Sequence, residues 1–205
     1  MEFKTTATPE VVQRTAEALL ARHIEAIVVP HGADALERIR ALIPAGASVM
    51  NGASRTLEQI GFVEYLKSGT HEWNNLHAAI AAEKDPVAQA VLRKQAVLSD
   101  WYLGSVHALA ETGECIIASN TGSQLPHIVF TSPNVIFVVS TKKIVPTLTD
   151  AFSRLEEHVM PLEDEHMKGK YGVGTAANKI VIVKGENPRM GRKVFIILVN
   201  EDLGF

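Results

Sequence analysis

The chain has 205 residues, 46% of them hydrophobic, and a formal charge of −3 from 20 Lys and Arg against 23 Asp and Glu. This composition suits one globular domain over residues 1–205, and the lack of a dense basic cluster argues against a nucleic-acid binder. A single cysteine, Cys115, excludes an internal disulfide and a metal centre ligated by cysteines of this chain alone. No apolar run is long enough for a membrane span or a signal peptide, so we expect a cytoplasmic protein without membrane contact.

The first third of the chain alternates helices and strands. Thr8 can cap a helix that has Pro9 in its first turn. The predicted elements are a helix from residue 9 to about 22, a strand at 24–29, a helix at 33–42, a strand at 48–51 and a helix that opens at 52–54 and runs to about residue 66. Strands that alternate with helices are typical of a parallel sheet with right-handed crossovers.

The remaining two thirds contain further strands and helices. Thr147 and Asp150 can cap a helix that runs to about residue 158. The other predicted elements are a surface connection at 67–75, a helix pair at 76–82 and 86–98, strands at 106–110, 115–118 and 135–140, a charged loop at 160–174, and strands at 179–184 and 193–199 joined by a hairpin-like connection. Together these elements predict a three-layer α/β protein, with a mostly parallel sheet between helices.

The first candidate ligand site follows the strand at 48–51. Asn51 ends this strand, Gly52 permits close approach of a ligand to the backbone, and the hydroxyl groups of Ser54 and Thr56 follow at the start of a helix. Such a segment can bind a phosphate or a carboxylate. The alternative is that Ser54 merely caps the helix.

The second candidate site is a loop of small polar residues after the strand at 115–118. Its predicted ligand-binding residues are Asn120, Thr121, Gly122, Ser123 and Gln124. The backbone of such a loop can form an anion-binding nest, and the alternative is a solvated turn into a helix.

Glu111 is the candidate catalytic residue. It lies in a tight turn with Thr112 and Gly113, which are also candidate binding residues, one strand away from the polar loop. Glu111 could be a general base, a nucleophile that forms a mixed anhydride, or a structural acid bonded to turn amides. The eight histidines show no metal-ligand spacing, so we predict no metal site, and Cys115 between apolar residues favours a buried, inert thiol.

From residue 99 to residue 205, and more loosely upstream, the chain resembles the lactate-utilisation (LUD) domain family. The matching segments are Ser99-Asp100, A-E-T-G-E at 110–114, S-N-T-G-S-Q at 119–124, K-K-I-V at 142–145, P-L-E-D-E at 161–165, N-K-I at 178–180, the final V-N-E-D-L-G-F and, upstream, N-G-A-S-R-T at 51–56. The resemblance implies a fold like that of sugar-phosphate isomerases and CoA transferases.

The same resemblance carries expectations about function. CoA transferases use a Glu in a short E-x-G turn as a nucleophile, and Glu111-Thr112-Gly113 is similar to that turn. Related LUD proteins are often encoded with iron–sulfur proteins that oxidise L-lactate to pyruvate. Some relatives carry cysteines before the last two strands, whereas residues 168–177 have none here, so no iron–sulfur ligands are expected from this chain.

Three functions remain open from the sequence. The leading one is a protein of L-lactate utilisation that binds a small anionic or acyl metabolite, such as a CoA-bearing or phosphate-bearing ligand, between residues 52–56, Glu111 and residues 119–124. The second is a non-catalytic subunit that docks on an iron–sulfur oxidoreductase through residues 200–205 or 160–170. The third is a sugar-phosphate isomerase or CoA-transferase-like enzyme. A homodimer is the default oligomer for this architecture.

Overall fold

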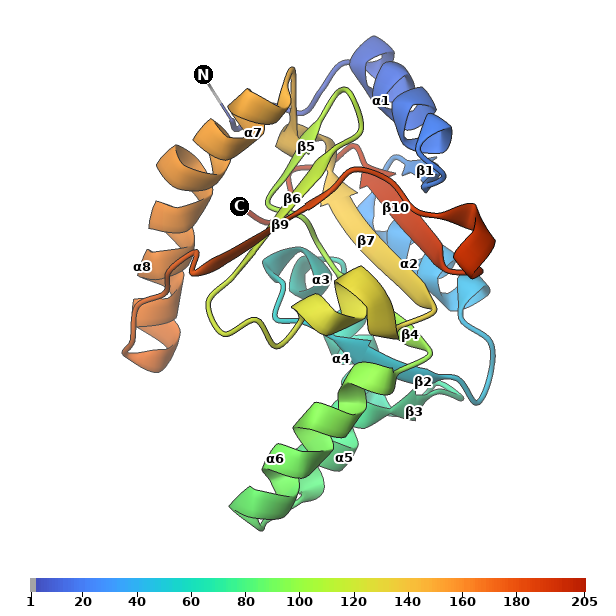
Figure 1. Cartoon of the computed structure of the whole chain (residues 1–205), viewed down its shortest axis with the longest axis vertical. Helices are drawn as coiled ribbons and strands as arrows, with labels where there is room; N and C mark the ends of the chain where they lie inside the picture. Colours follow the sequence, from blue (N-terminus) through green and yellow to red (C-terminus); the bar gives the residue numbers. More distant parts are fainter. Residues whose placement is uncertain (1–2) are drawn as a thin grey trace.

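The computed structural model describes residues 3–205, and of Tyr171 the backbone alone. Its centre is a six-stranded sheet in which all neighbouring strands are parallel, in the order β1-β10-β7-β4-β2-β3 (Figure 1). The strands are β1 (Glu25–Val29), β10 (Lys193–Val199), β7 (Asn134–Ser140), β4 (Trp101–Gly104), β2 (Ser48–Asn51) and β3 (Asn74–Asn75). The two long central strands, β7 and β10, are continuous apolar runs because both faces of the sheet are covered.

Helices cover one face of this parallel sheet. Ile39 of α2, Leu57 of α3 and Phe62 of α4 pack against side chains of the strands, such as Val49 and Ile136. These helices are α2 (Gly32–Leu42), α3 (Arg55–Gln59) and α4 (Phe62–Ser68). The single helix predicted up to residue 66 is therefore two helices. Gly61, at a φ of 79°, has the left-handed conformation that separates them.

A second, four-stranded sheet covers part of the other face, beside helix α1 (Pro9–Ala21). Its strands, in the order β8-β5-β6-β9, are β8 (Ile144–Val145), β5 (Ala108–Ala110), β6 (Cys115–Ser119) and β9 (Lys179–Val183). The predicted turn at 111–113 does connect an antiparallel pair, β5 and β6. The hairpin predicted between the last two strands is wrong, because β9 pairs with β6 and β10 lies between β1 and β7 in the main sheet.

The C-terminal helices pack on the outer face of the second sheet. Helix α7 (Leu148–Arg154) begins with the predicted capping box of Thr147 and Asp150, and continues through a π turn into α8 (Met160–Tyr171). Residues 160–174 were expected to form a loop, which is wrong for α8. Much of α8 faces a cavity and solvent, so its sequence lacks the apolar periodicity of a core helix.

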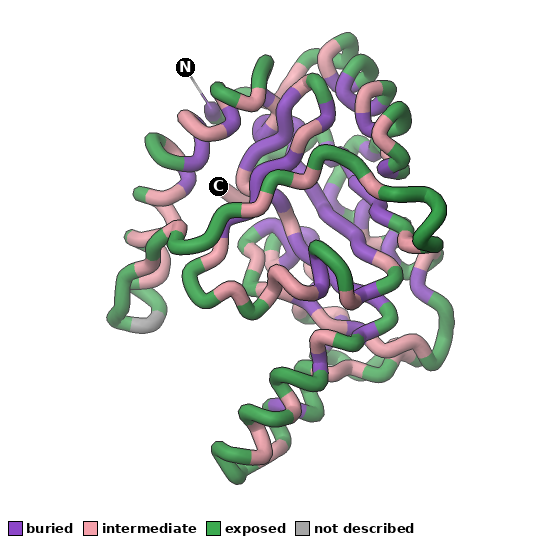
Figure 2. The backbone as a smooth tube through the Cα atoms, in the orientation of Figure 1, coloured by how far each residue is buried: buried purple, intermediate pink, exposed green. Residues whose placement is uncertain are grey.

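Helices α5 (Leu76–Ala82) and α6 (Pro86–Gln95) form the predicted pair and project from the body of the protein (Figure 1). Asn75 and Asp85 cap their N-termini. Most of this pair is exposed, in contrast to the buried strands of the main sheet (Figure 2). Within residues 3–205, no helix is both long and apolar enough to cross a membrane.

Candidate functional site

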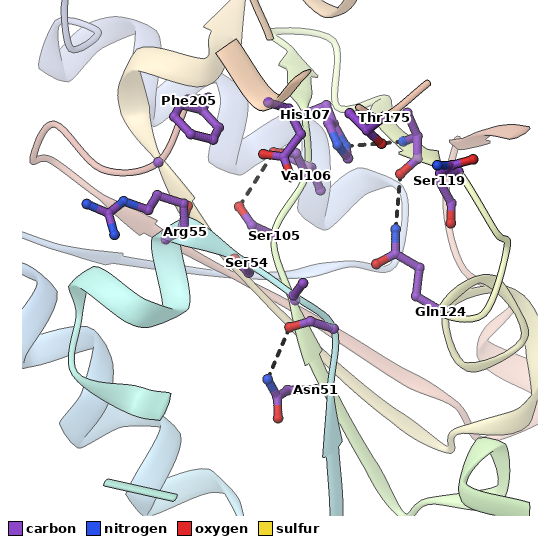
Figure 3. A pocket seen from close by; sticks show the side chains of 18 of the residues that line it. Asn51, Ser54, Arg55, Ser105, Val106, His107, Ser119, Gln124, Thr175 and Phe205 are labelled. Atoms are coloured by element: carbon purple, nitrogen blue, oxygen red, sulfur yellow. Dashed lines mark hydrogen bonds between the residues drawn. The ribbon is translucent and has the colours of Figure 1, made fainter. Parts of the chain in front are cut away.

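A cavity of about 450 Å³ opens at the carboxyl ends of β2 and β4, between the main sheet, the second sheet and α8. The carboxyl ends of parallel strands are the usual place for ligand sites in α/β proteins. Both polar loops identified in the sequence reach this cavity. Figure 3 shows Ser54 and Gln124, one from each loop, around the same space as His107 and Phe205.

The first loop follows β2. Its members Asn51, Gly52, Ser54 and Thr56 all line the cavity. The Oγ of Ser54 accepts a hydrogen bond from the backbone N–H of Leu57 at 3.3 Å, so Ser54 caps helix α3 as the alternative predicted, and ligand binding by Ser54 stays a prediction. A Cβ on Gly52 would stand 2.3 Å from the hydroxyl of Tyr102, which explains the need for glycine.

The second loop follows β6. Asn120, Thr121, Ser123 and Gln124 line the cavity, whereas Gly122 does not. The amide group of Gln124 donates to the carbonyl of Ala118 at 3.0 Å, and its Oε1 accepts from the Tyr102 hydroxyl at 3.4 Å. The loop is therefore fixed against the first loop through Tyr102.

Lys143 is the principal charge at the cavity wall, and its side chain is buried. Its Nζ donates to Thr56 Oγ1 at 3.2 Å, Ser105 Oγ at 3.1 Å and the Val106 carbonyl at 3.2 Å. In the described part of the chain, no carboxylate forms an ion pair with it. Burial, reinforced by the charge of Arg154, lowers the pKa of Lys143 to about 7.

His107 and Glu163 are two further titratable residues at the cavity wall. The Nδ1 of His107 accepts from the backbone N–H of Ala118 at 3.1 Å, so a neutral ring carries its proton on Nε2. Burial, together with the charge of Lys143, lowers the pKa of His107 to about 3, so the ring stays neutral near pH 7. Burial raises the pKa of Glu163, which lies on α8.

The charged residues at the α8 rim are paired with one another. Glu58 accepts from Arg55 at 3.3 Å and from Lys170 at 3.1 Å, and all three line the cavity. Two cations therefore share one carboxylate, and this group of three carries a net charge of +1. Lys143 differs from them, because the groups around its ammonium are neutral oxygens.

The structure places Glu111, Thr112 and Gly113 away from this cavity, and none of the three lines it. Glu111 accepts a hydrogen bond from Arg14 of α1 at 2.9 Å, and the Thr112 carbonyl accepts from Arg22 at 2.6 Å. The predicted arrangement of Glu111 facing both loops is therefore not found. The two loops come together, and Lys143 lies where an acid was expected.

Sequence reasoning did not select Lys143, His107 or Glu163 as site residues. The available signal for Lys143 was its place three residues after the predicted strand at 135–140, where a lysine must either reach solvent or enter the protein. Cys115 is buried, as expected, and burial raises the pKa of its thiol to about 12. Among residues 3–205, no group of His, Cys, Asp and Glu side chains is arranged to hold a metal ion.

The structure is that of an α/β protein with a cavity at the carboxyl edge of a parallel sheet. The chain belongs to the LUD domain family, whose model matches residues 12–198. Its fold is similar to the crystal structure of a DUF162 family protein from Deinococcus radiodurans, with a TM-score of 0.56 and 12% identity over 93% of this chain and 97% of that one.

A weaker similarity links the chain to ribose 5-phosphate isomerase A from Neisseria gonorrhoeae. The TM-score is 0.40 and the identity 14%, over 98% of this chain and 97% of that one. A similarity at this level does not bear on function. No curated protein matches the chain.

Proposed function

We propose that this LUD-domain protein binds a small carboxylate-bearing metabolite of L-lactate utilisation in the cavity between the two polar loops. The single observation that carries the proposal is the buried Lys143 at the cavity wall, bonded to neutral oxygens alone. A buried cation without a counter-ion is costly, and an anionic ligand would offset that cost. Membership of the LUD domain family supports an organic acid as the ligand.

The remaining polar groups of the cavity suit a small hydroxy acid or oxo acid. The hydroxyl groups of Ser54 and Thr56 can donate to a carboxylate, and a neutral His107 can donate from Nε2 to a hydroxyl or carbonyl oxygen. The cavity volume of about 450 Å³ also leaves room for a larger acyl or phosphate-bearing ligand. The panel of ligands tested should therefore include both sizes.

The test is isothermal titration of the purified protein with L-lactate, pyruvate, inorganic phosphate, a sugar phosphate and an acyl-CoA. We expect L-lactate or pyruvate to bind, and Lys143→Met to weaken that binding by about 30- to 100-fold, since a hydrogen bond to a charged group contributes about 2–3 kcal/mol. Lys84→Met removes an exposed lysine and serves as the control.

Equal affinity in wild type and Lys143→Met would contradict the assignment of Lys143. Failure of every anion to bind a folded wild-type protein would contradict the proposal as a whole. Preference for a sugar phosphate or an acyl-CoA over both lactate and pyruvate would replace the organic-acid ligand with one of those classes.

A second candidate function is docking on a partner subunit, which the family context suggests is an iron–sulfur oxidoreductase. The observation that favours it is the exposed apolar face of the projecting helix α6, where Val87 is 72% and Val91 is 48% exposed, with Leu98 at 71% just beyond. The tail at 200–205 is less suited to docking, because Lys142 contacts both Asp202 and Gly204.

Co-purification from the native cell tests this second function. A partner retained by the wild type and lost by the double variant Val87→Lys, Val91→Lys would support docking through α6. The matched control is Val129→Lys, at another exposed apolar position. A partner lost from the control as well, or from neither variant, would contradict docking through α6.

A further inference from the structure

We infer that Lys143 is a nucleophile that captures a 2-oxo acid in the cavity as a covalent imine, so that the protein distinguishes an oxo acid from a hydroxy acid chemically. This inference rests on the proposed function and names the substrate class of the same site. The observation behind this inference is the position of Lys143. Its amine lies at the wall of the cavity, and the groups around it can form hydrogen bonds with both the charged and the neutral amine.

The hydrogen bonds of Lys143 allow a change of protonation state without rearrangement of the protein. The charged ammonium donates to the hydroxyl oxygens of Thr56 and Ser105 and to the carbonyl of Val106. The hydroxyl group of Ser105 already donates to the Val138 carbonyl at 2.7 Å, but that of Thr56 can rotate and donate to a neutral amine, whereas a carboxylate could not. A neutral amine can therefore keep the Val106 carbonyl as acceptor while its lone pair accepts from a hydroxyl or turns to a ligand.

The charges around Lys143 come from three elements and favour the neutral amine. Arg154 of α7 and the neighbouring Lys142 lower its pKa, while Glu163 of α8 acts in the opposite direction, and burial is the largest cause. His107 is neutral near pH 7 and adds no charge. A desolvated lysine beside another cation is a recognised form of an activated amine nucleophile.

The reaction balances without an oxidant or a reductant. The neutral amine of Lys143 attacks the C2 carbonyl carbon, the carbon–oxygen π bond breaks, and the proton that nitrogen loses is taken up by the oxygen to give a neutral carbinolamine. The hydroxyl group then leaves as water with a proton, for which the carboxyl group of Glu163 is the candidate donor, since burial raises the pKa of Glu163. The product is a protonated imine, in which nitrogen regains its positive charge beside the ligand carboxylate.

This chemistry separates the two acids that the proposed function joins. L-Lactate has a hydroxyl group at C2 and can form only the ion pair with charged Lys143. Pyruvate has a carbonyl group at C2 and can form both the ion pair and the imine. The carboxylate carbon and C2 are directly bonded, so an amine close to the carboxylate is also close to the carbonyl carbon.

The experiment is reductive trapping. The protein is incubated with pyruvate and sodium cyanoborohydride, and the mass of the intact chain is measured. We expect one adduct, with the mass of pyruvate less one oxygen atom, and peptide mapping of the wild type places it on Lys143. Trapping should accelerate as pH rises through about 7, the range in which Lys143 loses its proton. Incubation with L-lactate should give no adduct.

Variants provide the second readout. Lys143→Arg keeps the positive charge but should lose the adduct, whereas the matched exposed-site variant Lys84→Arg should keep it. An adduct on Lys142 or spread over surface lysines would overturn the inference, and peptide mapping of the wild type detects this even if Lys143→Arg does not fold.

Isothermal titration distinguishes the failure of this inference from the failure of the proposed function. If pyruvate binds to the wild type but no adduct is trapped, imine formation is overturned and the proposed function stands. If neither pyruvate nor L-lactate binds, both are overturned.

Discussion

The charged side chains at the two ends of the second sheet differ in how they are paired. At the β5–β6 turn, Glu111 pairs with Arg14 at 2.9 Å and Glu114 pairs with Arg22 at 2.5 Å, and each cation meets a carboxylate. At the other end, the buried Lys143 donates to neutral oxygens, and in the described chain no side-chain carboxylate pairs with Lys143 or with the buried Arg154. Buried charges need a counter-ion more than exposed charges do. Here the exposed cations are paired and the buried cations have no carboxylate side chain beside them, so solvent exposure does not explain the difference.

The two buried cations also differ from each other. Arg154 donates to the main-chain oxygens of His107 and Phe205, and Arg154 itself does not line the cavity. Lys143 donates to the hydroxyl oxygens of Thr56 and Ser105 and lines the cavity. Arg154 therefore acts as a structural connection between the cavity wall and the C-terminal tail, and Lys143 is the cation available to a ligand.

The largest expected effect is on Arg154. Arg154→Met keeps much of the apolar volume but removes two charge-assisted hydrogen bonds, so we expect a loss of about 4 kcal/mol in the free energy of unfolding, measured with urea. Arg14→Met, which breaks an exposed pair, is the comparison and should cost less than about 1 kcal/mol. A loss under about 1 kcal/mol for Arg154→Met would show that the buried guanidinium is not a structural connection.

The pH dependence of the free energy of unfolding should show that burial of the charged Lys143 side chain destabilises the folded protein. Its pKa is about 7 in the folded protein against an ordinary value of 10.5, so from pH 7 to 10.5 the unfolded chain binds more protons. Stability from this residue therefore rises with pH, by about 4 kcal/mol between pH 7 and 10.5, and its cost is full well below pH 7.

The measurement is urea unfolding of wild type and Lys143→Met at several pH values between 7 and 10. The variant lacks the titrating group, so the difference between the two proteins isolates Lys143. A constant difference across this range would mean that Lys143 keeps an ordinary pKa and that a ligand is not needed to balance its charge.

A substitution of Gly52 tests whether the two polar loops of the cavity must lie close together. A Cβ at this position would stand 2.3 Å from the Tyr102 hydroxyl and 2.9 Å from Gln124 Oε1. We expect Gly52→Ala to lower the free energy of unfolding by about 2 kcal/mol, because the packed side chains around the new methyl group must shift. The same shift should weaken ligand binding. Gly169→Ala, at an α8 position with no atom near the new Cβ, is the control for thermal unfolding. Equal stability of both variants would show that the loops separate freely.

The smallest effect is expected at Glu111. Its partner Arg14 is 58% exposed, and such a pair contributes about 0.2–1 kcal/mol. Glu111→Gln should change the unfolding free energy by about that amount and leave the affinity for L-lactate or pyruvate unchanged in titration. A loss of affinity above about tenfold would show that Glu111 contributes to ligand binding. The two ends of the second sheet would then no longer differ in this respect.

Much of the fold was predictable from local pattern. Pro9 and the capping box of Thr147 and Asp150 marked helix starts, and the apolar runs of β7 and β10 marked buried strands. Strand β4 (Trp101–Gly104) was not predicted, and the partner of β9 depends on long-range pairing that no local pattern encodes.

The candidate site was predictable only in part. Both loops were found because small polar residues after a strand have a direct physical meaning, and the parallel sheet brings their ends together. Glu111 was chosen because it is close to the second loop in sequence, but a hairpin turn points away from the strand ends that carry the loops. Lys143 was missed because the burial of a lysine depends on Arg154, Thr56 and Ser105, which are distant in sequence.

The walls of the cavity come from two different sheets and from α8, and this has a consequence for motion. A ligand held between the β2 loop and α8 acts as a non-covalent cross-link, and its binding energy is lost whenever the second sheet moves away from the main one. Strand β9, a largely exposed edge of the second sheet, is the segment best placed to open locally. Occupancy of the cavity should then slow amide hydrogen exchange in β9, although this strand contributes no cavity residue of its own.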